Sequence, residues 1–290
     1  MNQSKQIRGG ITVLALVALW APSILAETQT STTSPQAAAP SLMDKIKVSY
    51  VNLFTGAAIS DPLSSYQPNQ DVGRGSKGDL LALTNWLGAK YKLTDDVAAG
   101  VVANFTLDPV QSHTFTMKDP YVKLENGKLI NSGNFNVYAD LRLAPGVTSK
   151  SQSANRWLSV TSKQNTTYEV PNTRVTLGVL SILQANAFSG PAQTKAGDVT
   201  QKDFVVEAYP NISYKLGANI SATLGYDMNA SHTRDNGLLS FQSDGTDLEP
   251  GLDWDITPSI NFSPFLSIKT GNRIAADTTT VAFWFTAKIL

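Results

Sequence analysis

Polar and charged side chains recur at every second position in several stretches of this chain. Around residue 140, Tyr138, Asp140 and Arg142 alternate with apolar residues. Side chains two residues apart on a β-strand point to the same face, so this spacing would gather acids and bases on one surface. Such a surface could attract and guide ions or small polar solutes. The other residues assigned to it are Arg174, Glu207, Asp227, Asp247, Glu249, Asp253, Asp255 and Lys288.

Hydrolysis is the alternative chemistry. His113 and His232 are the two histidines of the chain, and they are the side chains best suited to act as a general base near neutral pH. Ser231 precedes His232, but adjacent strand residues point to opposite faces, so the pair is poorly placed for a side-chain hydrogen bond. A catalytic triad needs groups that converge in space. We therefore do not expect an enzyme.

No cofactor or resident metal is expected either. The 290 residues include no cysteine, which excludes thiolate ligands and Cys nucleophiles. The acidic pair Asp253-x-Asp255 is more ordinarily a structural turn than a metal site. Some aromatic residues share the phase of the charged positions and could stack on sugars or bases, although filling space is the commoner role. They are Trp86, Tyr138, Trp157, Tyr209 and Trp284.

The segments that carry these residues are predicted to be β-strands. From Val97 to Leu107 every odd position is apolar, and most even positions are small or polar. A helix of this sequence would spread its polar residues around the whole cylinder, whereas a strand has one clean apolar face. The alternation predicts an all-β chain of about twelve strands, between about 10 and 14. The expected ranges are 47–57, 79–93, 97–107, 118–130, 134–144, 155–170, 173–186, 203–215, 219–231, 238–256, 259–269 and 278–289.

The connections between these strands alternate between short turns and longer polar loops, of which 58–78 is the longest. An even strand count with this asymmetry is typical of a transmembrane antiparallel up-and-down β-barrel, with short periplasmic turns and longer extracellular loops. Asn126-Gly127 is a strong tight-turn signal, so 118–130 could instead be a small extra hairpin. A water-soluble sandwich is the other alternative, but it would have to bury one face of a dozen strands.

One phrase recurs near the short turns. YKLTDDV at residue 91, YKLGANI at residue 214 and WDITPSI at residue 254 each have an aromatic residue, then an aliphatic one two positions later. An aromatic ring with a polar edge suits the layer between hydrocarbon and water. Several such rings at one level predict an aromatic girdle, formed by Tyr91, Tyr168, Tyr214 and Trp254.

The N-terminus is predicted to be an export signal. Lys5 and Arg8 precede a short apolar run that ends at Trp20, and the small residue Ala26 follows. This order is typical of a cleaved signal peptide over residues 1–26. Removing its two basic residues from the 23 of the whole chain leaves 21 against 23 acidic ones, a balance that does not favour nucleic acid as a partner. Residues 27–46, rich in Ser, Thr, Ala and Pro, are expected to be a flexible periplasmic linker.

The C-terminal strand carries an apolar stripe at Val281, Phe283, Phe285, Ala287 and Ile289. It resembles the last strand of bacterial outer-membrane barrels, although the final residue is Leu290 rather than an aromatic one. With the alternating strands and the aromatic girdle, residues 47–290 resemble porin-like outer-membrane proteins. The resemblance implies a Gram-negative outer membrane, contact with its lipid, recognition by the barrel-assembly machinery, and leaves an oligomer open.

The function expected from these patterns is passive passage of small polar solutes or ions. The acidic residues between 247 and 255 suggest a preference for cations. Two alternatives remain open: the inner charges pair with one another and seal a structural barrel, or the long loops make the protein a surface adhesin. The 58–78 loop could fold inward to constrict a pore or outward to bind.

Overall fold

The computed structural model describes residues 42–61, 82–109, 113–191, 201–234, 240–271 and 274–290. The predicted signal peptide and most of the 58–78 loop lie outside these residues. The described chain is almost entirely β-structure, with two short helices, α2 (Leu42–Lys45) and α3 (Ser149–Ser153). Its strands are β1 (Ile46–Ala58), β2 (Ala82–Lys92), β3 (Val97–Leu107), β4 (Phe115–Ser132), β5 (Phe135–Pro145), β6 (Arg156–Glu169), β7 (Val175–Phe188), β8 (Lys202–Lys215), β9 (Ile220–Thr233), β10 (Gln242–Thr257), β11 (Ile260–Lys269) and β12 (Thr279–Lys288). The all-β prediction is confirmed.

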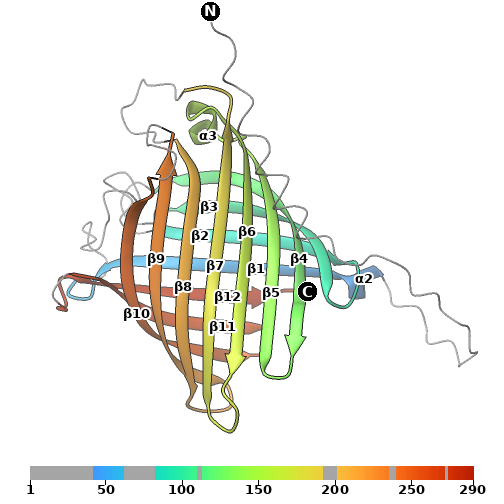
Figure 1. Cartoon of the computed structure of the whole chain (residues 1–290), viewed down its shortest axis with the longest axis vertical. Helices are drawn as coiled ribbons and strands as arrows, with labels where there is room; N and C mark the ends of the chain where they lie inside the picture. Colours follow the sequence, from blue (N-terminus) through green and yellow to red (C-terminus); the bar gives the residue numbers. More distant parts are fainter. Residues whose placement is uncertain (1–41, 62–81, 110–112, 192–200, 235–239, 272–273) are drawn as a thin grey trace, which may run out of the picture. The chain divides into compact units, whose positions relative to one another are not determined.

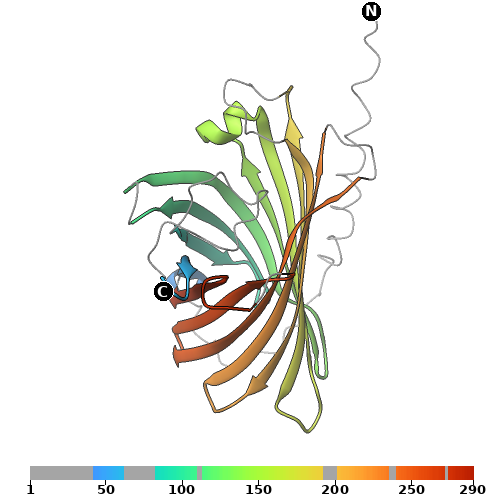
Figure 2. The same ribbon diagram turned by 90° about the vertical axis from the view of Figure 1, so that its left-hand side faces the viewer.

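The strands close into a barrel in which each one pairs antiparallel with its neighbours in sequence. β1 pairs with β2 on one side and with β12 on the other, which completes the ring. Figures 1 and 2 show the strongly tilted strands of this wall. Closure gives every strand two partners and leaves no open sheet edge. The predicted up-and-down barrel is therefore confirmed, and the sandwich alternative is wrong.

The two ends of the barrel differ in the length of their connections. Turns at one end, the short-turn end, span 93–96, 133–134, 170–174, 216–219 and 258–259. Connections at the other end, the long-loop end, span 59–81, 108–114, 146–155, 189–201, 234–241 and 270–278. Because the strand number is even, β1 starts and β12 finishes at the short-turn end.

The outer face of the barrel is apolar and exposed. Along β3 the odd positions point outward, and Val101 exposes 57% of its surface. It lies between Ala89 of β2 and Val122 of β4, and Val122 is 51% exposed. A continuous apolar surface of this kind calls for a non-aqueous neighbour. The residues of the opposite phase form the inner face.

Two polar residues of β1 and β2 lie on the outer face without exposing their amides. Asn52 and Asn85 are directly opposed and are 6% and 1% exposed. The Asn85 side-chain oxygen accepts hydrogen bonds from Asn52 Nδ2 at 2.8 Å and from the Tyr50 hydroxyl at 2.5 Å. The Asn85 amide nitrogen donates to the Leu83 carbonyl at 2.7 Å. These bonds meet the requirement that polar groups on an apolar surface be satisfied within the protein.

Two local interpretations of the sequence need correction. The alternative of a small hairpin at Asn126-Gly127 is wrong, because β4 runs unbroken through these residues, as a strand over 118–130 would, and only its register with β5 shifts between Asn126 and Ile130. The end of the expected linker is structured, with α2 over Leu42–Lys45 and β1 starting at Ile46. Beyond β12, Ile289 still donates to the Val48 carbonyl at 2.8 Å, so pairing continues almost to the C-terminus.

The two described helices are both a single turn, and neither is long and apolar enough to cross a membrane. α3 lies at the long-loop end, where Asp119 of β4 fixes the start of the β5–β6 connection. One carboxylate oxygen of Asp119 accepts from the backbone nitrogens of Val147 at 3.0 Å and Thr148 at 2.8 Å. The other accepts from the Ser151 hydroxyl and from Arg156.

Candidate functional site

The inner face along β2 to β6 carries basic side chains held over buried acids. Glu125 of β4 has a side chain only 8% exposed and pairs with Lys90 of β2 and with Lys123, the latter at 2.6 Å. The Lys90 and Lys123 side chains are 36% and 20% exposed. Lysine stems can lie along the wall while the charged ends reach the more polar side. The carboxylate therefore lies deep in the wall, and the positive charges face the interior.

A second acid repeats this arrangement on β5. Asp140 has a side chain 2% exposed and accepts from Arg142 at 2.6 Å and 2.9 Å, a two-bond pair of the strong kind. The Tyr138 hydroxyl lies 3.0 Å from Asp140 and 3.3 Å from Glu125, and so connects the two acids. Lys163 of β6 interacts electrostatically with Asp140. We call this set of residues, Lys90, Lys123, Glu125, Tyr138, Asp140, Arg142 and Lys163, the basic wall.

A glycine makes room for the contact between Lys90 and Glu125, which crosses an intervening strand. Lys90 and Glu125 come from β2 and β4, with β3 between them, and Gly100 of β3 is the direct neighbour of both Lys90 and Lys123. A Cβ at Gly100 would lie 2.9 Å from the Lys90 Cβ and 2.7 Å from the Ala89 carbonyl oxygen. The missing side chain lets Lys90 extend across β3 to its carboxylate partner.

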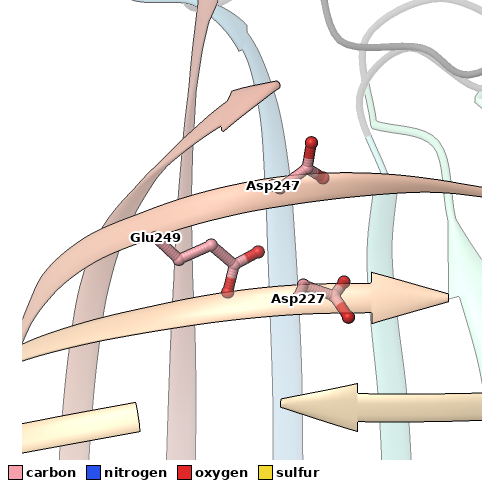
Figure 3. Close-up of side chains that lie close together, drawn as sticks. All are labelled: Asp227, Asp247 and Glu249. Atoms are coloured by element: carbon pink, nitrogen blue, oxygen red, sulfur yellow. The ribbon is translucent and has the colours of Figure 1, made fainter. Parts of the chain in front are cut away.

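The inner face of β9 and β10 is acidic instead. Asp227 of β9 is directly opposite Asp247 of β10, and Glu249 follows two residues later on the same face (Figure 3). One carboxylate oxygen from each lies within 4.8 Å of the others, a spacing that a cation could bridge. Asn229 donates to Asp227 at 2.9 Å. We call Asp227, Asp247 and Glu249 the acidic triad.

Gly225 plays the same part here as Gly100 in the basic wall. Tyr209 of β8 hydrogen-bonds Glu249 of β10. The strand between them is β9, and its residue beside this hydrogen bond is Gly225. A Cβ on Gly225 would be 1.9 Å from the Tyr209 hydroxyl oxygen. The phenol therefore lies across β9 only because residue 225 has no side chain, and it anchors one member of the acidic triad.

Nearer the short-turn end, a polar ladder continues along β10 and β11. Asp253 Oδ1 accepts from the Ser263 hydroxyl and from Asn261 Nδ2, both at 2.7 Å. Asn261 also donates to Asp255 at 3.1 Å. The expected structural turn at Asp253-x-Asp255 is wrong, because both residues lie within β10. Ser263 faces Trp284 of β12, whose ring stacks on Trp86 at 5.7 Å between centroids.

The remaining predicted inner residues have different placements. Glu207 of β8 interacts electrostatically with Lys163. Lys288 shares the phase of Trp284, and its ammonium donates to the Pro258 carbonyl at 3.2 Å. Arg174 is a correction: it is an exposed residue of the β6–β7 turn and does not line the inner face. The strand predicted over 173–186 includes Arg174, but β7 begins at Val175.

The four residues predicted to form the aromatic girdle lie on the outer face near the short-turn end. Their exposed fractions are 37% for Tyr91, 41% for Tyr168, 47% for Tyr214 and 45% for Trp254. Tyr168 is directly opposite Phe135, and Trp254 is directly opposite Phe262, so other rings adjoin two of them.

The residues considered for catalysis do not converge. Ser231 faces Val205 and Gln242, whereas His232 is on the other face, opposite Phe204. The His232 ring packs between Phe204 at 6.2 Å and Phe241 at 5.7 Å. Its Nδ1 lies 3.7 Å from Asp203. This arrangement places the histidine in an aromatic cluster at the long-loop end, away from the inner charges.

Sequence reasoning missed three members or neighbours of the basic wall. Tyr121, Lys123 and Glu125 alternate with Val122 and Leu124, and this alternation should have placed them on the inner face. The turn signal at Asn126-Gly127 instead suggested a separate hairpin, in which these residues would not line the barrel. In the structure the Arg142 guanidinium lies 5.2 Å from the centre of the Tyr121 ring.

No family model and no curated protein matches the chain. The fold is similar to that of an outer membrane channel from Pseudomonas putida F1, with a TM-score of 0.52 and 11% identity over 90% of this chain and 100% of that one. The NanC porin aligns with a TM-score of 0.47 and 9% identity, over 84% and 100% of the two chains. A Salmonella typhi OmpF structure, in complex with daunomycin, gives 0.39 and 8% over 84% and 97%. The closed twelve-strand ring and the similarity to the Pseudomonas putida channel show a porin-like outer-membrane barrel fold.

Proposed function

We propose that this protein is a channel of the bacterial outer membrane through which small polar solutes and ions pass passively. The observation that carries the proposal is the contrast between the two faces of one closed wall. Val101, Leu87 and their neighbours expose apolar surface outward, while acids and bases share the inner face. Lipid outside and water inside satisfy both faces at once.

The placement in the membrane follows from the same surface. Tyr91, Tyr168, Tyr214 and Trp254 would form the girdle at the periplasmic interface, where rings with a polar edge are favoured. The short turns would then face the periplasm and the long loops the outside, as in other barrels of this class. Outer-membrane lipid and the barrel-assembly machinery would be the partners, after export with a cleaved signal peptide.

A preference for cations is the finer proposal. The acidic triad lies on the inner face with Asp253 and Asp255 nearer the short-turn end, so carboxylates follow β9 and β10 along much of the barrel. The basic wall opposes this preference, but its two acids, Glu125 and Asp140, are buried and offset part of its positive charge. Carboxylates that line a pore raise the local concentration of cations.

The test is electrical. Purified protein, refolded in detergent and shown to be folded by heat-modifiable gel migration, should give single-channel currents in a planar bilayer. In a potassium chloride gradient the reversal potential should indicate cation preference, and Asp227→Asn combined with Asp247→Asn should weaken it. Arg174→Gln is the matched control, since this exposed turn residue should leave selectivity unchanged.

One observation favours a sealed structural barrel as the second candidate. Glu125 and Asp140 are both paired, as expected if inner charges neutralise one another across a closed centre. Folded protein that gives no channel events in the bilayer would support this candidate and refute the channel. A channel that conducts but prefers anions would remove the cation preference alone.

The absence of an enzymatic role is also a proposal. Ser231 and His232 occupy opposite faces of β9, and the His232 ring is enclosed by two phenylalanines. Loss of a lipase or protease activity in a His232→Ala variant would contradict it.

A further inference from the structure

Two indole rings stack on the inner face and form a platform about halfway along their strands. Trp86 of β2 and Trp284 of β12 stack across β1, with ring centroids 5.7 Å apart and planes inclined by 29°. Val51 and Leu53 of β1 are their direct neighbours and fill the wall beneath. Trp284 nevertheless keeps 38% of its surface exposed. Part of the Trp284 side chain is therefore open to the lumen, where a ligand could contact it.

Beside the platform is a set of hydrogen-bond acceptors. Ser263 is directly opposite Trp284, and Asp253 follows on the next strand. The Ser263 hydroxyl and the Asn261 amide both donate to Asp253 Oδ1, and the same amide donates to Asp255 Oδ1. These two donors are thus directed to the Oδ1 oxygens, and within the described part of the chain neither Oδ2 oxygen accepts a hydrogen bond. The second oxygens, Oδ2, remain as acceptors for a ligand.

The spacing sets the size of what would fit. Trp284 and Asp253 are two strands apart, which corresponds to about 10 Å between their backbones. The residue between them is Ser263, whose side chain is small. A ligand of a few heavy atoms could therefore lie over Ser263, with one side against the indole and the other against the carboxylate.

The chemistry of these groups selects the charge of the ligand. The face of an indole attracts cations, and a carboxylate oxygen accepts from N–H or attracts a positive charge. A neutral sugar would also need hydrogen-bond donors, and the two donors nearest the acids, Ser263 and Asn261, are directed to the carboxylates. The neighbouring base, Lys288, directs its ammonium to the Pro258 carbonyl. We infer that Trp86, Trp284, Asp253 and Asp255 form a binding site for small organic cations, such as quaternary or primary amines.

This inference rests on the proposed channel only in that its ligand must enter the lumen, and binding can be measured without conduction. Isothermal titration of the folded full chain in detergent micelles would use choline and, as its neutral isostere, 3,3-dimethylbutan-1-ol. Choline should bind and the isostere should not. Trp284→Leu should weaken choline about fivefold, the worth of one cation–π contact of about 1 kcal/mol. Asp253→Asn should weaken it about tenfold through loss of a nearby charge.

The matched control is Trp254→Leu. Trp254 adjoins Asp253 on β10 but lies on the outer face with 45% exposure, so its loss should leave choline affinity unchanged. Asp253→Asn hardly changes the shape of the side chain. A loss of choline affinity in this variant would therefore not be explained by misfolding, as it could be in Trp284→Leu. Unchanged affinity in both Trp284→Leu and Asp253→Asn, or equal binding of the isostere, would overturn the site.

Different results would refute the proposed channel and the proposed cation site. Choline binding by a protein that passes no current would refute the channel and leave the site standing. Channel currents from a protein that does not bind choline would refute the site and leave the channel standing.

Discussion

Replacing Glu125 with glutamine tests the organisation of the basic wall. The carboxylate is 8% exposed and pairs with both Lys90 and Lys123, and the Tyr138 hydroxyl is 3.3 Å away. Glutamine keeps the shape of the side chain and so leaves no cavity. The substitution removes one negative charge and brings two lysines together without their counter-ion. The expected result is a less stable barrel whose inner face is more positive.

The size of the effect follows from the exposure of the three partners. Removing one member of a fully buried ion pair costs about 3–5 kcal/mol, whereas exposed pairs contribute about 0.2–1 kcal/mol. Glu125 is buried, but Lys90 and Lys123 are 36% and 20% exposed and can be rehydrated. We therefore expect the free energy of unfolding to fall by about 1–3 kcal/mol, between these two limits.

Equilibrium unfolding in urea, with the barrel in lipid vesicles and folding followed by tryptophan fluorescence, measures this difference. The control is Asp96→Asn, since Asp96 and Lys128 are 3.8 Å apart with side chains 48% and 59% exposed. That exposed pair should change the unfolding free energy by less than about 0.5 kcal/mol. A double-mutant cycle with Lys90→Met would isolate the coupling between Lys90 and Glu125.

The reasoning would be refuted if Glu125→Gln were as stable as Asp96→Asn. That result would mean that water reaches Glu125 freely and that its burial in the wall is not maintained. In the bilayer, the same variant should shift the reversal potential toward anions. A shift toward cations would contradict the assignment of this residue to the inner face.

The remaining predictions concern the outer face, the glycine in the acidic region and the long-loop end. Val101→Arg, at the middle of β3, should destabilise the barrel by about 2–4 kcal/mol, whereas Leu93→Arg in the β2–β3 turn should cost about 0–1 kcal/mol; equal costs in urea unfolding would refute the lipid-facing assignment. Gly225→Val should displace Tyr209 and cost about 1–3 kcal/mol through overpacking, seen as reduced heat-modifiable migration; full stability with unchanged selectivity would contradict the crossing of β9. Asp119→Ala leaves two backbone nitrogens and an arginine without their acceptor, so hydrogen exchange at residues 147–151 should accelerate, and unchanged exchange would argue against the anchor.

The sequence alone was sufficient for the local structure of this barrel. Alternation along Val97–Leu107 predicted β3 with its observed bounds, because the two-residue period of a strand is a property of the backbone. The same period assigned Tyr138, Asp140 and Arg142 to one face, and the contacts among them agree. Errors arose where a local signal was strong, as at Asn126-Gly127, or at a strand boundary, as at Arg174.

Only the tertiary structure decided which side chains meet across strands. Lys90 and Glu125 are 35 residues apart in sequence, and Trp86 and Trp284 are 198 residues apart (284 minus 86). Their meeting depends on the register of each strand pair and on closure between β1 and β12, and neither is visible in a single strand. Gly100 and Gly225 looked like ordinary small residues in an alternating pattern. In the barrel each glycine leaves space on the inner face of its strand. A side chain of one neighbouring strand crosses that space and reaches its partner on the other.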